Sequence, residues 1–81
     1  MTELFAFVVA RIAETASAAA RAGDRVGERY HLTSLAIVDA MRRDFEEDPR
    51  PADELVRYLC RSAASWSAHP DFRRHWLYEA R

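Results

Sequence analysis

Apolar residues recur every three or four positions along the first part of the chain, which is the spacing of one face of an α-helix. The residues that share this spacing are Leu4, Phe5, Val8, Val9, Ile12, Ala13, Ala16, Ala19 and Ala20. Thr2 is a residue type that caps helix starts, and Gly23 suits the left-handed conformation that often ends a helix. A first helix is therefore expected over residues 3–22. Phe7 falls outside its main stripe, and we expect it at an edge or facing a second chain.

A second stripe with the same spacing begins after Asp24, a residue that can cap a helix directly. The residues in this stripe are Val26, Tyr30, Thr33, Ile37, Met41 and Asp44 or Phe45, widened by Leu35 and Val38. The stripe predicts a second helix that continues to Glu47. The alternative is a break near Thr33, where Thr33 or Ser34 would cap a new helix.

Two prolines separate this segment from the next helical pattern, because Pro49 and Pro51 lack the backbone N–H that a helix interior needs. Pro51 suits the first turn of a third helix. The apolar residues of that helix are Leu55, Val56, Leu59, Cys60, Ala63 (or Ser62) and Trp66. Pro70 then begins a short fourth helix, in which Phe72 and Trp76 share a face. We expect these two rings to fold back over the end of the core.

The helical patterns together predict an all-α fold, with one domain over residues 1–81. The domain is expected to be a small bundle of three main helices and a short C-terminal helix. Fifteen of the 81 residues are alanine, which favours helices and allows them to approach closely.

The charge pattern excludes several classes of partner. All twelve basic residues are arginine and the net charge is −1, so the chain has no basic footprint for nucleic acid or an anionic membrane. The apolar run over residues 4–13 is too short to span a bilayer. A single cysteine forms no internal disulfide, and no signal peptide precedes the domain. We therefore expect a cytoplasmic protein without a nucleic-acid or membrane partner.

The candidate metal ligands are Cys60, His69 and His75, with His31 elsewhere in the chain. Eight residues separate Cys60 from His69 and five separate His69 from His75, which matches no common zinc spacing. Cys60 also lies within a predicted helix, away from a helix N-terminus that would activate its thiol. We expect no enzymatic activity and no cofactor. A metal- or small-ligand-binding protein that uses these three residues is the alternative function.

Aromatic and arginine residues alternate near the C-terminus, and both types dominate the energetic centres of protein interfaces. The predicted interface residues are Trp76, Tyr78, Arg73, Phe72, Tyr58 and Phe7. A second interpretation places the rings of Trp66, Phe72 and Trp76 in the core. The function predicted from this segment is protein–protein contact, as a homodimer or as an accessory or regulatory partner.

Both ends of the chain resemble a family of short actinobacterial proteins that carries a domain-of-unknown-function label. The opening run is LFAFVVARIAE, residues 4–14, and the closing box is AHPDFRRHW, residues 68–76. The box has the pattern His-Pro-Asp-aromatic-Arg-x-x-Trp, and the two ends cover about a quarter of the chain. The resemblance implies a bacterial, cytoplasmic context and a shared structural role for the box. It implies no activity.

Overall fold

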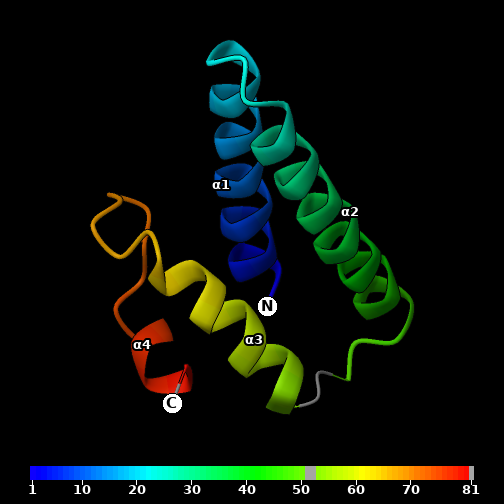
Figure 1. Ribbon diagram of the computed structural model, residues 1–81. Helices are drawn as coiled ribbons and strands as arrows, with labels where there is room; N and C mark the ends of the chain where they lie inside the picture. The colour runs from blue at the N-terminus through cyan, green and yellow to red at the C-terminus, as the bar shows by residue number, and fades with distance from the viewer. Residues whose placement is uncertain (51–52, 81) are drawn as a thin grey trace.

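The computed structural model describes residues 1–50 and 53–80, which form four helices (Figure 1). These are α1 (Thr2–Arg21), α2 (Arg25–Glu47), α3 (Asp53–Ala64) and α4 (Trp76–Glu79). The described part contains no strand, so the predicted all-α fold with three main helices and a short C-terminal one is confirmed. The expected role of Pro51 lies outside the described residues.

Helices α1 and α2 form an antiparallel hairpin with a tight connection at residues 22–24 (Figure 1). Gly23 has φ +75°, the left-handed conformation predicted for this position. Asp24 caps α2 as predicted, since its Oδ1 accepts a hydrogen bond from the backbone N–H of Gly27 at 2.9 Å. Thr2 does not cap α1: the cap position is Met1, and Thr2 is the first helical residue.

Helix α2 is continuous, so the alternative of a break near Thr33 is wrong. The Thr33 hydroxyl donates to the backbone carbonyl of Arg29 at 2.9 Å, one turn earlier in the same helix. The Thr33 hydroxyl is therefore bonded to the preceding turn of the same helix. The alternative required this side chain to cap the start of a new helix.

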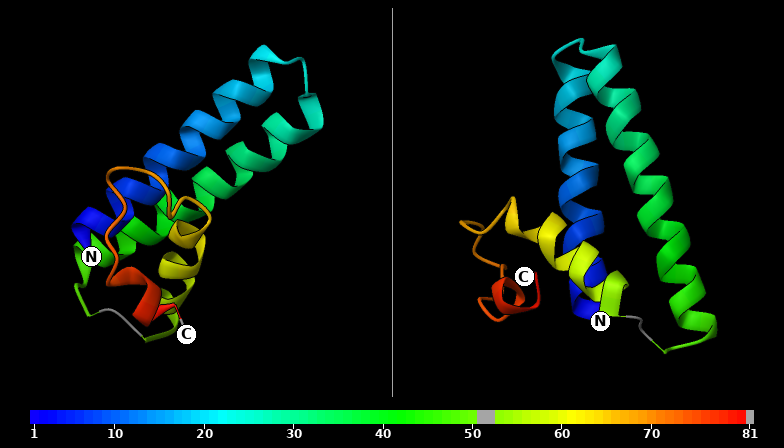
Figure 2. Two further views of the ribbon diagram at one scale, coloured as in Figure 1. Left: turned by 90° about the vertical axis from the view of Figure 1, so that its left-hand side faces the viewer. Right: turned by 60° about the horizontal axis from the view of Figure 1, so that its bottom comes forward.

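The core lies where α3 crosses the part of the hairpin that contains the chain's N-terminus (Figures 1 and 2). The most deeply buried large side chains are Phe5, Val8, Val38, Leu59 and Cys60. Helix α3 packs against α1 and α4, whereas α2 packs against α1 alone among the helices of the described part. The far half of the hairpin therefore extends beyond α3 and α4 without a third helix over it. No helix in the described part is both long enough and apolar enough to cross a membrane.

The expected helix from Pro70 onward is wrong in its start, because α4 begins only at Trp76 and residues 65–75 form turns. The side chain of His69 still makes a bond of the capping type, since its Nδ1 accepts the backbone N–H of Asp71 at 3.0 Å, but no helix follows it directly. Beyond this turn the segment is held by tertiary contacts, since Phe72 packs against Phe7 and Arg73 pairs with Glu3 on α1. Phe72 and Trp76 nevertheless meet over the core, with ring centroids 5.4 Å apart.

Candidate protein-interaction surface

The aromatic residues of the predicted interface are mostly internal. Trp76 is 4% exposed and Phe7 is 6% exposed, and their ring centroids lie 5.2 Å apart in an edge-to-face arrangement. Phe72, half-buried, completes the cluster at 6.0 Å from Phe7. Phe7 was expected at an edge or facing a second chain, and the structure corrects this: the turn after α3 brings the C-terminal rings onto its side of α1. Neither Phe7 nor Trp76 presents its ring at the surface.

The other predicted interface residues remain outside the core. Tyr58 on α3 and Tyr78 on α4 are exposed. Arg73 forms an ion pair with Glu3 at 2.9 Å, which ties the turn before α4 to the first turn of α1. The six residues predicted from the sequence therefore do not form one surface.

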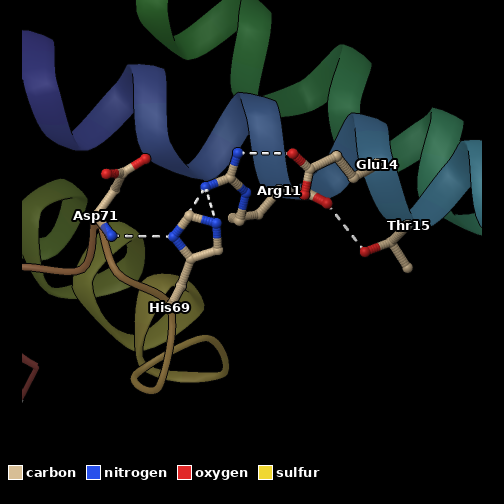
Figure 3. A network of polar contacts seen from close by, with 5 residues as sticks. All are labelled: Arg11, Glu14, Thr15, His69 and Asp71. Atoms are coloured by element: carbon tan, nitrogen blue, oxygen red, sulfur yellow. Dashed lines mark hydrogen bonds and ion pairs between the residues drawn. The ribbon is translucent and has the colours of Figure 1, made fainter.

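Arg11 on α1 was not among the residues predicted for the site, because it interrupts an apolar run. It is only 9% exposed, and its guanidinium lies between His69 and Glu14 (Figure 3). Nη1 lies 2.8 Å from Nε2 of His69, and Nη2 donates to Oε1 of Glu14 at 2.7 Å. The guanidinium carbon also lies 5.2 Å from the ring centroid of Phe7, a cation–π contact. One signal was present in the sequence: Arg11 follows Phe7 by four residues, so the two share a helix face.

The three candidate metal ligands have separate environments. Cys60 is buried in the core, and this burial, with the nearby charge of Glu79, raises the pKa of its thiol. His69 is engaged by Arg11 and by the backbone of Asp71, while His75 is exposed beside Trp76. Within the described residues, no three His, Cys, Asp or Glu side chains are grouped so that they could hold a metal ion.

A cleft of about 270 Å³ lies next to the Arg11 network. Its charged lining residues are Glu3, Arg11, Asp71 and Arg73. Two of these four charges are acidic and two are basic. Moreover, Arg11 is paired with Glu14 and Arg73 with Glu3. The cleft therefore offers no net charge with which to select an ionic ligand.

Four of the seven large apolar side chains that are exposed among the described residues lie on α2: Val26, Tyr30, Leu32 and Ile37. Val26 is 83% exposed, Tyr30 is 68% exposed and Ile37 is 48% exposed. With the exposed Thr33 they follow a 4-3-4 spacing, so they form one stripe along the helix, which we call the α2 stripe. The sequence pattern had placed these four residues in a single stripe with Met41, widened by Leu35 and Val38.

The face of α2 that packs on α1 carries Val38, which is fully buried, with Leu35, Met41 and Phe45 half-buried around it. Val38 directly follows Ile37, and successive residues of a helix are separated by about 100° around its axis. The two apolar stripes are therefore distinct faces of one helix, and α1 covers only one of them.

Four charged residues of α2 form a network of ion pairs within the helix: Asp39, Arg42, Arg43 and Glu46. Asp39 pairs with Arg42 and with Arg43, each at 2.7 Å, and Arg42 also pairs with Glu46 at 2.7 Å. The hydrogen bond from Arg42, helped by the charge of Arg43, lowers the pKa of the Asp39 carboxyl. The i,i+4 spacing of Asp39–Arg43 and of Arg42–Glu46 brings these charges together on one face of the helix, whereas Arg43 and Glu47, at the same spacing among the described residues, form no ion pair.

Four other charges of α2 flank the α2 stripe at its two ends. Arg25 and Arg29 lie near the N-terminus of the helix, and Asp44 and Glu47 lie in its last turn. All four are exposed, and none makes an ion pair with another residue of ranges 1–50 and 53–80.

Comparison of the chain with models of known families, with curated proteins and with solved structures found no match. Function is therefore inferred from the residues of this chain alone.

Proposed function

We propose that this protein is a non-enzymatic helical protein that acts through protein–protein contacts, with the α1–α2 hairpin as its binding element. The observation that carries the proposal is the α2 stripe, in which Val26, Tyr30 and Ile37 are each about half exposed or more. Apolar side chains that are aligned along one helix face are typical of a surface that packs against another helix.

The position of this stripe supports the same proposal. Helix α2 packs against α1 alone, and the far half of the hairpin extends beyond α3 and α4 (Figure 2). The exposed side chains of Tyr58 and Tyr78 lie on the opposite part of the fold, on α3 and α4. The α2 stripe is the better candidate because it is straight, continuous over three helical turns and flanked by charges without a partner in the described chain.

The reactive side chains of the chain support a role without catalysis. The thiol of Cys60 is buried and its pKa is raised, which disfavours the nucleophilic thiolate. His69 accepts from a backbone N–H and contacts Arg11, so it serves the fold. The proposal includes the absence of a cofactor and the cytoplasmic location expected from the sequence.

The proposal is tested by site-specific photo-crosslinking in the cells that make the protein. A benzophenone amino acid replaces Tyr30 in one variant and Tyr58 in the other, since both tyrosines are exposed on helices. The expected result is a discrete covalent adduct with a protein, or with a second copy, from position 30 and little adduct from position 58. An absence of adducts at position 30, or equal yields at both positions, contradicts the proposal.

A further inference from the structure

Asp44 lies on the line of the α2 stripe and Arg29 and Glu47 lie beside it, while Arg25, which directly precedes Val26, lies about 100° further round the helix. Helix α2 has 23 residues and is thus about 34 Å long. Val26 and Asp44 are eighteen residues apart, which is five turns at about 3.6 residues per turn, so both project in the same direction. Arg29 and Glu47 are also eighteen residues apart and share a direction for the same reason. The stripe therefore runs between a basic end and an acidic end.

This polarity makes the surface complementary to itself. In an antiparallel pair of such helices, the basic end of each helix lies next to the acidic end of the other helix. In a parallel pair, Arg25 and Arg29 would lie next to their own copies, which is unfavourable. The helix macrodipoles also favour the antiparallel arrangement.

We propose that α2 pairs antiparallel with α2 of a second copy of this chain, about a two-fold axis near residue 35. This proposal rests on the proposed function and names its partner. The axis lies midway between Val26 and Asp44, so Thr33 and Ile37 of the two copies meet at the centre. Arg25 and Arg29 of each copy then lie beside Asp44 and Glu47 of the other. Such a two-fold interface uses the same patch on both subunits.

The pairing also covers the face of the α1–α2 hairpin that no other helix of the described chain covers. Two α1–α2 hairpins joined through α2 bring four helices together, an arrangement in which apolar helix faces are buried against one another. Tyr30 and Ile37 of both copies leave water in the process. The charges at the two ends then set the direction and register of the helices, as charged flanking residues do in coiled coils.

Two charge-reversal variants test the proposal. The first is Arg25→Glu with Arg29→Glu, and the second is Asp44→Arg with Glu47→Arg. The first variant places acidic residues near the N-terminus of α2, and the second places basic residues in its last turn. The helix dipole favours both changes. The last turn of α2 contains no basic residue in the native chain. Folding is therefore expected to be retained, and circular dichroism checks it for each variant.

Native mass spectrometry then compares the wild type, each variant alone and an equimolar mixture of the two variants, which differ in mass. We expect a wild-type dimer and about tenfold or greater weakening of self-association in each variant alone, because like charges meet at both ends. In the mixture, opposite charges meet at both ends, so a heterodimer is expected to recover the wild-type affinity.

Three results overturn the proposal. A wild-type protein that stays monomeric up to roughly 1 mM excludes a second copy as the partner. Variants that dimerise alone as well as the wild type exclude α2 as the interface. A mixture without heterodimer excludes the antiparallel pairing. A monomeric wild type whose position 30 crosslinks to a different protein overturns this proposal while the proposed function stands, whereas an absence of adducts at position 30 overturns both.

Discussion

Nη1 of Arg11 lies 2.8 Å from Nε2 of His69, although the two residues are 58 positions apart in the chain. The contact joins α1 to the turn between α3 and α4 (Figure 3). The other ring nitrogen of His69 accepts the backbone N–H of Asp71, so one imidazole holds the turn and docks it on α1. The Nε of Arg11 is buried without a hydrogen-bond partner in the described chain. The contacts of Nη1 and Nη2 must therefore offset the free-energy cost of burying the guanidinium charge.

The first prediction is that Arg11 and His69 are energetically coupled. His69→Ala is expected to lower the free energy of unfolding by about 1–3 kcal/mol, since it removes the hydrogen bond that the ring accepts from Asp71 and its contact with Arg11. Arg11→Met keeps much of the side-chain volume and removes the charge. The double variant is expected to be about 1 kcal/mol more stable than the sum of the single effects predicts. Urea unfolding of the four proteins measures this coupling, and strictly additive effects would contradict it.

The second prediction concerns the aromatic cluster on the core. Trp76→Ala is expected to destabilise the fold by about 3–5 kcal/mol, because a buried indole leaves a large cavity next to Phe7. Leu77→Ala is the matched control, since Leu77 neighbours Trp76 and is exposed. The control is expected to change stability by about 0.5 kcal/mol or less. Chemical unfolding followed by far-UV circular dichroism compares the two, and similar losses would show that Trp76 contributes little to the core.

The third prediction separates association from folding. Tyr30→Glu places a charge in the middle of the proposed α2 pairing and is expected to shift the proposed dimer to monomer in sedimentation velocity. Its melting temperature at low protein concentration should stay near that of the wild type, because Tyr30 is exposed within each chain. Tyr58→Glu introduces the same charge on α3 and should leave the dimer intact. Loss of the dimer in the Tyr58 variant alone would move the interface to α3.

The fourth prediction follows from the raised pKa of Cys60. Burial disfavours the thiolate in the folded state, so the unfolded chain loses this proton at a lower pH than the folded one. The contribution to stability is complete below the unfolded pKa of about 8.5 and declines as the pH rises above it. Unfolding free energies of the wild type and of Cys60→Ala, measured between about pH 7 and 10, are therefore expected to converge at high pH.

The same burial predicts slow chemistry at this thiol. A thiol-reactive dye is expected to label Cys60 much more slowly in the native protein than in urea at the same pH. Rapid native labelling at neutral pH would show that α3 opens readily around Cys60.

Local signals in the sequence determined the helices and two of their ends. Gly23 and Asp24 act through their own backbone and the next turn, so the hairpin connection could be predicted without any knowledge of the rest of the fold. The all-α architecture followed from the same short-range patterns. Helical spacing also placed the charge pairs of α2, because residues four apart meet on any helix.

Only the tertiary structure decided which helix faces are covered. Val38 and Ile37 are adjacent and both apolar, and α1 packs against one of them while the other stays exposed. Nothing local distinguishes the two faces, since burial depends on where the partner helix lies. The same holds for Phe7, which is buried because residues 72–76 fold back onto it.

The Arg11–His69 contact shows this division most directly. The ion pair of Arg11 with Glu14 is local to α1, whereas its contact with His69 reaches it from a turn 58 residues away. The sequence by itself determined where the chain is helical, because helix formation depends on near neighbours. Which apolar face stays exposed depends on long-range packing, and only the folded structure decided that.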